Sequence, residues 1–420
     1  MTVIPNAKKF VLPNGIRVVT EHIPSLRSVA TGIMVGVGSG NELPKEAGIS
    51  HYIEHMMFKG TNKRSAFEIA HALDAVGGKM NAYTSKEVTV YYAVVLDRHI
   101  NTAIDVLCDI VINSVYDPKE MEVEKGVILE EIKMYEDTPD ELIHDLFVEK
   151  ILPGHPLGSP TIGYAETVKA VKREDILDYR RRFYSPKNMI ISLAGALPDN
   201  LEAVLAPYFA GFTGQEVKLV QPQPKIKGSI SLKHKKTEQT HLCLGTQGPS
   251  QLDDDRYAFS LLENIMGGSM SSRLFQEVRE KRGLVYAIFS TTSPFRDFGL
   301  AYTYAGTSHE NLPQVVDLIL KEMGKVKKEG LTKAEIERAK EYLKGTTVLG
   351  LESTSSRMGW LAKCELYYGK TITIDEVFSK IDKVTNDDIV RLANKYFTND
   401  ALTLAVIGDF AELPVKSLAC

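Results

Sequence analysis

An internal repeat constrains the fold of this chain more than any other feature of its sequence. Residues 171–195 (VKREDILDYRRRFYSPKNMIISLAG) and residues 384–408 (VTNDDIVRLANKYFTNDALTLAVIG) match without a gap, at a constant offset of 213 residues. Each copy has the pattern of a capped amphipathic helix, an aromatic pair, a turn and an apolar strand that ends in glycine. A repeat of this kind predicts two halves of similar fold.

The stretch between the two copies predicts where one half ends and the other begins. Residues 215–227 (QEVKLVQPQPKIK) are rich in proline and lysine and show no sustained hydrophobic period, as is typical of a linker. We therefore expect an N-terminal domain at 1–214 and a C-terminal domain at 228–420. Strand and helix patterns alternate in both, so we expect an α+β (mixed α/β) fold in which each half is a mostly antiparallel sheet packed with helices.

Composition excludes several classes of partner. The net charge of −4 gives no support for binding to nucleic acid or to a membrane surface. The longest apolar runs, such as residues 90–96, are too short to span a bilayer, and the N-terminus lacks the apolar core of a signal peptide. The four cysteines are far apart and show no C-x-x-C spacing. These features predict a cytoplasmic protein with no nucleic-acid or membrane partner.

Residues 47–58 (AGISHYIEHMMF) carry the chemistry that stands out most. They place His51, Glu54 and His55 within five residues. In a helix, His51 and His55 are one turn apart on one face, and Glu54 points to nearly the same side. Two imidazoles at this spacing can hold one zinc ion, and a neighbouring carboxylate can take a proton from a metal-bound water.

This pattern, H-x-x-E-H, is the signature of the inverzincins, but two histidines in an ordinary helix are the simpler interpretation. Ser50 is the expected N-cap of the helix, with Gly48 interrupting the chain before it. A catalytic zinc ion needs a third protein ligand and an open position for water. The rest of the chain must therefore supply a further ligand if the metal interpretation is correct.

A second predicted helix, opened by Asp117 and Pro118, is a candidate source of that ligand. It is unusually acidic, and its glutamates include Glu120, Glu122, Glu124, Glu130 and Glu131. Glu124 and Glu131 are seven residues apart, two helical turns, and so share a face. A solvated acidic face accounts for most of these residues.

The sequence at this point resembles the pitrilysin/insulinase family of zinc peptidases, most closely the mitochondrial processing peptidase and its bacterial homologues. The resemblance is carried by H-x-x-E-H followed, after a long gap, by two glutamates separated by six residues, and it runs nearly end to end. It implies that His51, His55 and Glu131 bind one zinc ion per chain and that Glu54 is the general base. Glu124 would not bind the metal itself but would orient the residues that do.

The second half matches the family through VREKRGLVY, which carries Arg279 and Tyr286. The resemblance implies that this pair holds the substrate backbone and polarises the scissile carbonyl beside the zinc. The alternative is the end of an amphipathic helix followed by a core tyrosine. In the family, the zinc domain of one half faces the Arg/Tyr domain of the other, so the resemblance implies a homodimer with composite active sites.

The resemblance also implies two sets of substrate-binding residues. One lies on an edge strand that pairs with an extended peptide and includes Asn81, Ala82 and Tyr83. An ordinary hairpin strand would have the same composition.

The other set is Glu141 and Asp145, which would receive an arginine near the cleavage site. They lie one helical turn apart, and Glu141 has a second, structural interpretation as the capping-box partner of Thr138.

These features together predict a zinc-dependent metalloendopeptidase that resembles the processing peptidases and hydrolyses peptides or unfolded protein segments. Two alternatives stay open. One is a non-catalytic structural or assembly subunit of the same family. The other is a chain that is active only with a paralogous partner.

Overall fold

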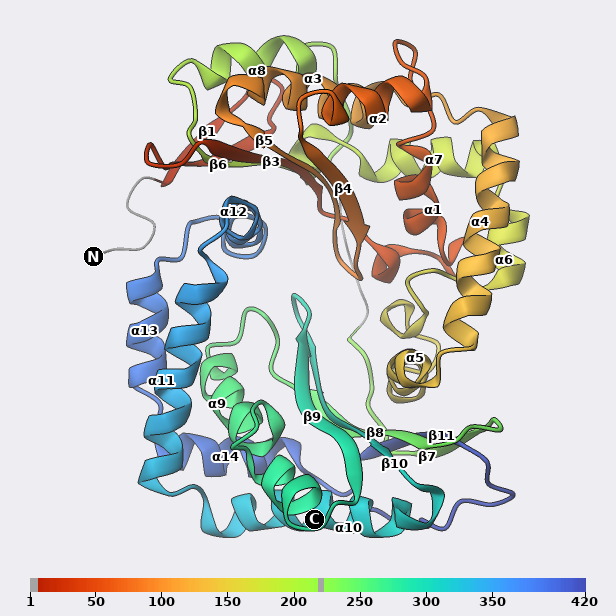
Figure 1. The fold of residues 1–420 in the computed structure, drawn as a ribbon, viewed down its shortest axis with the longest axis vertical. Coiled ribbons are helices and arrows are strands. Elements are labelled where there is room, and N and C mark those ends of the chain that lie inside the picture. Colours follow the sequence, from red (N-terminus) through yellow and green to blue (C-terminus); the bar gives the residue numbers. More distant parts are fainter. Residues whose placement is uncertain (1–6, 218–222) are drawn as a thin grey trace. The chain divides into compact units, whose positions relative to one another are not determined.

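A computed structural model describes residues 7–217 and 223–420 of the chain. The chain divides into two compact units, each assembled from three separate segments (Figure 1). Unit 1 comprises residues 1–133, 159–221 and 348–374, and unit 2 comprises residues 134–158, 222–347 and 375–420.

Unit 1 is built on a six-stranded sheet with the order β1-β2-β6-β3-β5-β4. The pair β2/β6 is parallel and every other neighbouring pair is antiparallel. The strands are β1 (Ala7–Val11), β2 (Arg17–His22), β3 (Ser28–Val35), β4 (Lys79–Thr84), β5 (Thr89–Leu96) and β6 (Met189–Gly195).

Helices cover both faces of this sheet. In Figure 1, α3 and α8 lie on one face and α12 lies on the other, where it packs on β2, β3 and β6. The helices with most of their residues in unit 1 are α1 (Ile49–Met56), α2 (Ala66–Asp74), α3 (Ile100–Asn113), α4 (Pro118–Glu136), α6 (Ala165–Ala170), α7 (Arg173–Phe183), α8 (Leu201–Phe209) and α12 (Thr354–Tyr368).

Unit 2 repeats this topology in a five-stranded sheet, with the order β7-β11-β8-β10-β9. The pair β7/β11 is parallel and the remaining pairs are antiparallel, which is the pattern of β2-β6-β3-β5-β4 in unit 1. The strands are β7 (Ile230–His234), β8 (Thr240–Gly248), β9 (Val285–Pro294), β10 (Gly299–Thr307) and β11 (Thr403–Gly408).

The helices of unit 2 also correspond to those of unit 1. Helix α5 packs on β8 and β11, the counterparts of two of the strands that α12 covers, and α9 packs on β9. The helical segments with most of their residues in unit 2 are α5 (Pro139–Ile151), α9 (Asp255–Gly267), a π-helical segment (Phe275–Glu280), α10 (Leu312–Glu329), α11 (Lys333–Gly350), α13 (Ile374–Asp382) and α14 (Asn386–Tyr396).

The repeat in the sequence is thus a repeat in the structure. Helix α7 and strand β6 form its first copy, and α14 and β11 form its second. In both units, the apolar strand of the repeat lies inside the sheet, which explains why all of its residues are buried. The predicted fold class, two similar halves of mostly antiparallel sheet and helix, is confirmed.

The compact units differ in two segments from the contiguous halves that the sequence predicts. Residues 134–158, which carry α5, belong to unit 2, and residues 348–374, which carry α12, belong to unit 1. The pattern of an amphipathic helix shows which face is buried but not which sheet covers it. The predicted linker forms neither helix nor strand at 215–217 and 223–227, and residues 218–222 lie outside the described residues.

Two predicted caps are wrong. Ser50 is not the N-cap of α1, because the helix starts at Ile49 after Gly48, and the Ser50 hydroxyl is instead hydrogen-bonded to the Tyr179 hydroxyl at 2.7 Å. Thr138 makes no side-chain cap for α5, since its hydroxyl donates to the backbone carbonyl oxygen of Met134 at 2.7 Å. The capping-box role of Glu141 therefore disappears.

Candidate metal centre

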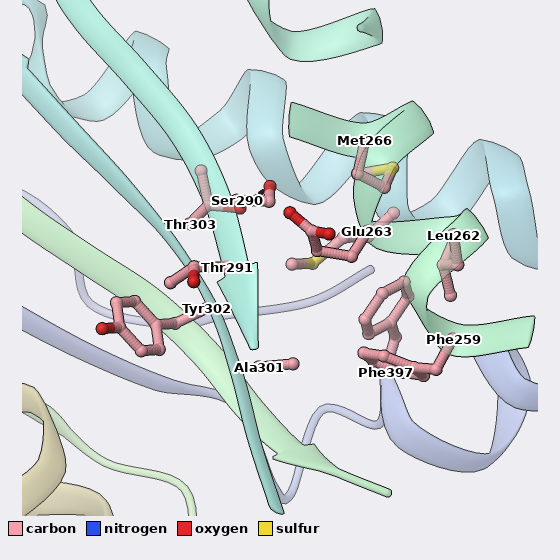
Figure 2. Close-up of a pocket in the computed structure, with 11 residues that line it drawn as sticks. Phe259, Leu262, Glu263, Met266, Ser290, Thr291, Ala301, Tyr302, Thr303 and Phe397 are labelled. Atoms are coloured by element: carbon pink, nitrogen blue, oxygen red, sulfur yellow. Dashed lines mark hydrogen bonds between the residues drawn. The ribbon is translucent and has the colours of Figure 1, made fainter. Parts of the chain in front are cut away.

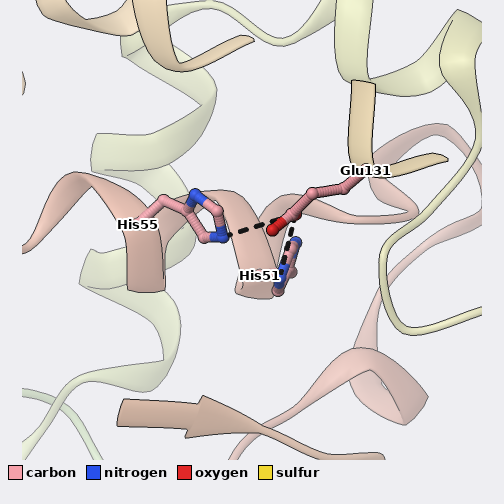
Figure 3. Close-up of side chains that lie close together, drawn as sticks. All are labelled: His51, His55 and Glu131. Atoms are coloured by element: carbon pink, nitrogen blue, oxygen red, sulfur yellow. Dashed lines mark ion pairs between the residues drawn. The ribbon is translucent and has the colours of Figure 1, made fainter. Parts of the chain in front are cut away.

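Three potential metal ligands converge in unit 1. Helix α1 presents His51 and His55 on one face, with ring centroids 4.5 Å apart. From α4, the Oε2 atom of Glu131 lies 3.9 Å from Nε2 of His51 and 3.7 Å from Nε2 of His55 (Figure 3). Two ligands of a tetrahedral zinc ion, each about 2.1 Å from it, lie roughly 3.4 Å apart, so a small closure of these side chains would bring them onto one ion.

The chemistry of these donors fits a divalent cation. Glu131 Oε2 is buried and has no hydrogen-bond partner among the described residues, although it points at both imidazoles. Burial, with a further contribution from His55, lowers the pKa of His51 to about 4. His51 is therefore neutral at physiological pH and keeps a lone pair for a metal. Two imidazole nitrogens and one carboxylate oxygen are a ligand set that zinc uses in catalytic sites.

The buried carboxylate of Glu124 holds one of the histidines in place. Its Oε1 lies 2.9 Å from Nδ1 of His55, and its Oε2 lies 2.5 Å from Nζ of Lys59. A carboxylate at this position favours the tautomer in which Nδ1 carries the proton, which leaves the lone pair of Nε2 facing Glu131. The contacts of Glu124 are those expected of an orienting residue.

Glu54 lies on the same helix as the two histidines and has its own partner. Thr84, at the end of β4, donates a hydrogen bond from Oγ1 to Oε2 of Glu54 at 2.6 Å. Burial raises the pKa of Glu54, and the bond from Thr84 opposes part of that shift. A carboxylate with a raised pKa is a better proton acceptor, which is the property that a general base requires.

The N-terminus of α1 is fixed by a carboxylate from outside the helix. Glu42 accepts hydrogen bonds from the backbone amides of Gly48 at 2.7 Å and Ser50 at 2.8 Å. These amides have no partner inside the helix, so Glu42 provides the cap that Ser50 does not. Gly48 is required here, because its φ is +94° and a Cβ would lie 2.6 Å from the carbonyl oxygen of Ile162.

A second contact joins the two helices that carry the ligands. The buried Tyr52 hydroxyl donates to the carbonyl oxygen of Met121 at 2.5 Å and so ties α1 to α4. Sequence reasoning missed Glu42, Tyr52, Lys59 and Thr84. Only Lys59 carried a signal, since it lies one helical turn after His55; the other three contacts depend on chain segments that meet only in the fold.

The glutamates of α4 are divided between exposed and inward-facing positions. Glu130 is exposed and pairs with Lys133 at 2.7 Å, so it points away from the histidines, whereas Glu131 points toward them. Glu122 is exposed as well and pairs with Lys125. Glu124 is the buried carboxylate of this helix.

Arg279 and Tyr286 meet in unit 2. The guanidinium carbon of Arg279, in the π-helical segment, lies 5.6 Å from the centre of the Tyr286 ring and 4.8 Å from that of Phe275. Tyr286 is the second residue of the edge strand β9 and is 78% exposed, which contradicts its alternative interpretation as a core residue. The Tyr286 ring therefore lies at the surface of unit 2, beside the guanidinium group of Arg279.

The predicted substrate residues lie in different units. Strand β4, which carries Asn81, Ala82 and Tyr83, is the edge strand of the unit 1 sheet, so one side of its backbone has no strand neighbour there. Glu141 and Asp145 lie on α5, which belongs to unit 2 together with Arg279 and Tyr286.

The repeated fold and the His-His-Glu cluster define a class of protein with two similar domains, one of which has a potential metal site. Family comparison agrees with this description. The family model "Insulinase (Peptidase family M16)" matches residues 17–164, and the model "Peptidase M16 inactive domain" matches residues 170–343. The chain belongs to the insulinase family, peptidase family M16.

Bacterial relatives match the chain along nearly its whole length. "Uncharacterized zinc protease YmxG" of Bacillus subtilis is 40% identical over 407 residues, which cover 97% of this chain and 99% of that protein. "Uncharacterized zinc protease SCO5738" of Streptomyces coelicolor is 41% identical over 426 residues, which cover 99% of this chain and 92% of that protein. Both are named as zinc proteases.

Solved structures share the fold. The crystal structure of a peptidase M16 inactive domain from Pseudomonas fluorescens superposes with a TM-score of 0.90 at 21% identity, over 98% of this chain and 100% of that one. A protease from Helicobacter pylori superposes with a TM-score of 0.87 at 23% identity, over 96% of this chain and 100% of that one. Within residues 7–217 and 223–420, none of the helices is both long and apolar enough to cross a bilayer.

Proposed function

We propose that this protein is a zinc-dependent metalloendopeptidase that acts on peptides or unfolded protein segments in the cytoplasm. The observation that carries the proposal is the cluster in unit 1: donor atoms of His51, His55 and Glu131 all lie within 4.8 Å of one another, and Glu54 projects from the same helix as the histidines. Membership of a family whose relatives are named zinc proteases supports the same chemistry.

The residues of the cluster divide the chemistry between them. A zinc ion held by His51, His55 and Glu131 would supply a Lewis acid that activates water and polarises a peptide carbonyl. Glu54 accepts the proton of the attacking water and delivers it to the leaving amine, as its raised pKa allows. Glu124 keeps Nε2 of His55 directed at the ion through its contact with Nδ1.

Substrate binding is assigned to both units. The unpaired edge of β4, at Asn81, Ala82 and Tyr83, would accept an extended peptide as an additional strand, which requires a short or unfolded substrate. The carboxylates of Glu141 and Asp145 would favour a basic residue near the cleaved bond, as in a processing peptidase.

We further propose a homodimer in which Arg279 and Tyr286 of one chain complete the metal site of the other. This arrangement can be tested by mixing two variants, Glu54→Gln and Tyr286→Phe, each of which should have low activity alone. A composite site predicts that mixing and dimer exchange restore up to about a quarter of the wild-type activity, because half of the dimers then contain one intact site. If mixed samples stay at the mean of the two variants, the site is not shared between chains.

The peptidase proposal is tested by measuring metal content and cleavage of a quenched fluorescent peptide that contains arginine, with and without a chelator. We expect one zinc per chain, and loss of cleavage in Glu54→Gln with the metal retained. Glu130→Gln is the matched control, since Glu130 is an exposed neighbour of Glu131 and should leave both readings unchanged.

Two other outcomes would replace this proposal. Bound zinc with no cleavage by the pure chain would favour a requirement for a paralogous partner. A chain that binds no metal would favour the non-catalytic subunit.

A further inference from the structure

The half without the metal motif has a pocket of its own. It lies in unit 2 between α9 and the strands β9 and β10, and opens to solvent, with an empty volume of about 320 Å³ when the adjoining open solvent is included (Figure 2). Helix α9 lines it with Phe259, Leu262, Glu263 and Met266, whose spacing places them on one helical face. Phe397, which follows α14, closes one end.

The pocket is lined by elements that occupy the same place in the topology of unit 2 as α1, β4 and β5 occupy in unit 1. Helix α9, the π-helical segment and strands β9 and β10 follow one another as α1, α2, β4 and β5 do. Phe259 and Glu263 on α9 have the four-residue spacing of His51 and His55 on α1. Where α1 carries two imidazoles at this spacing, α9 carries an aromatic ring and a carboxylate.

Glu263 is the charged residue among the eleven that line the pocket, and it has no counter-charge. Among residues 7–217 and 223–420, no hydrogen bond or ion pair engages its carboxylate, and burial alone raises its pKa to about 7. In Figure 2 the carboxylate points from α9 toward Ser290 and Thr303. A carboxylate without a partner in a largely apolar pocket is unfavourable, and a bound cation would relieve that cost.

The groups around the carboxylate of Glu263 indicate which kind of ligand the pocket would bind. The hydroxyls of Ser290 and Thr303 are hydrogen-bonded to each other at 2.8 Å and leave further acceptor capacity beside Glu263. At the other end, the rings of Phe259 and Phe397 lie with their centroids 6.4 Å apart. A carboxylate and hydroxyl acceptors at one end, with aromatic faces at the other, are complementary to a cation carried on an apolar chain.

We propose that this pocket binds an organic cation, an ammonium or guanidinium group on an apolar chain, with Glu263 as its counter-charge. The cationic head pairs with Glu263 and the hydroxyls of Ser290 and Thr303, and the apolar chain packs on Phe259 and Phe397. This chemistry has two sources, a free amine or the lysine or arginine side chain of a peptide. The site goes beyond the proposed peptidase activity, since it lies in the half that has no metal ligands.

The close approach of α9 to β9 gives the pocket a fixed wall. A Cβ on Gly267 would lie 2.3 Å from Oγ of Ser290, so the end of the helix packs directly on the strand. Glu263 lies one helical turn before this contact between Gly267 and Ser290. Its position is therefore fixed without a ligand, as expected of a preformed binding site.

The test measures binding by calorimetry at about pH 8, where the carboxylate is mostly ionised. The protein is the full chain in the Glu54→Gln background, so no peptide is hydrolysed and the result does not depend on the peptidase proposal. The probes are n-pentylammonium, for free amines, and N-acetyl-Ala-Lys-Ala-amide, for basic side chains. Their neutral counterparts are 1-pentanol and the same peptide with norleucine.

We expect at least one cationic probe to bind about tenfold or more tightly than its neutral counterpart, and Glu263→Gln to remove this difference. Glu337→Gln on α11 is the matched control, because Glu337 is an exposed glutamate of the same unit outside the pocket. Binding of the peptide would assign the site to a basic side chain, and binding of pentylammonium alone to a free amine.

A second measurement guards against a variant that merely folds differently. Because the carboxylate of Glu263 has no partner in the described part of the chain, the Glu263→Gln variant should have a higher melting temperature than the parent chain at about pH 8. A saturating concentration of the cationic probe should raise the melting temperature of the parent chain and so reduce the difference between the two. The proposal is overturned if neither cationic probe is preferred over its neutral counterpart, or if Glu263→Gln binds the cations as well as the parent chain does.

Discussion

At the residue scale, the candidate metal centre depends on carboxylates that differ in burial although they share one helix. Glu130 and Glu131 are adjacent, but the first pairs with Lys133 at the surface and the second faces two imidazoles. Glu124, on the face of Glu131, is buried against His55. The seven-residue spacing of Glu124 and Glu131 agrees with this division, because residues two turns apart lie on the same face of a helix, whereas adjacent residues do not.

The contact between Glu124 and His55 leads to a prediction about metal affinity. Replacing Glu124 with Gln should weaken zinc binding by about 10- to 100-fold, because the neutral amide holds the His55 tautomer less firmly and lowers the basicity of Nε2. Competition with a chelator of known affinity measures the change. Glu122→Gln, on the exposed face of the same helix, is the control, and an effect of equal size there would show that the charge of α4, rather than this contact, sets the affinity.

Glu42 leads to a prediction about pH. Burial raises its pKa from 4.5 to about 7, so between these values the folded protein binds more protons at this site than the unfolded chain does. Its contribution to stability is therefore fully present below about pH 4.5 and is lost as the pH rises through about 7. The free energy of unfolding, measured by urea titration across this range, should fall less steeply with pH in Glu42→Gln than in the wild type. Parallel pH profiles would contradict the assignment.

At the element scale, the position of α1 depends on both of its ends being attached to other segments. An eight-residue helix is too short to be stable alone, so its geometry must come from tertiary contacts. Glu42 supplies one attachment through two backbone amides, and Tyr52 supplies the other through the Met121 carbonyl of α4. The distance between the histidines and Glu131 therefore depends on residues that touch no metal.

Tyr52→Phe tests this coupling. Removing the hydroxyl leaves the Met121 carbonyl oxygen without this donor, which should cost about 1–3 kcal/mol of stability and also weaken zinc binding, because α1 and α4 are then less firmly joined. Chemical denaturation and metal competition measure the two effects. Tyr342→Phe, at an exposed tyrosine, is the control. A variant that loses stability but binds zinc normally would show that the contact supports the fold alone.

At the scale of the whole molecule, each compact unit includes a helix that comes from the other half of the sequence. Helix α12 comes from the second half of the sequence but covers the unit 1 sheet, where Leu361 and Ala362 pack on Met34 and Ile190. The buried Glu21 of β2 pairs with Arg357 of the same helix. Helix α5, from the first half, covers the unit 2 sheet in turn.

This exchange predicts how fragments of the chain behave. Residues 1–214 expressed alone lack α12, so one apolar face of their sheet is exposed and the fragment should aggregate or bind a hydrophobic dye. Co-expression with residues 215–420 should restore a soluble, co-purifying pair. Dye binding and gel filtration provide the measurements. A monomeric, cooperatively folding fragment 1–214 would show that α12 is dispensable for this sheet.

Most local elements, the repeat and the spacing of the candidate ligands along the chain could be predicted from the sequence. Those features depend on short periods, such as the four-residue spacing of His51 and His55, or on an exact offset between two segments. Three features became visible only in the folded chain. Glu42 caps α1, Thr84 donates a hydrogen bond to Glu54, and α5 and α12 each belong to the unit formed mainly by the other half of the sequence. Burial and hydrogen bonding depend on which segments lie close together in space. The pattern of a single sequence shows that an apolar face must be buried or a backbone amide must be bonded, but not which distant segment does this.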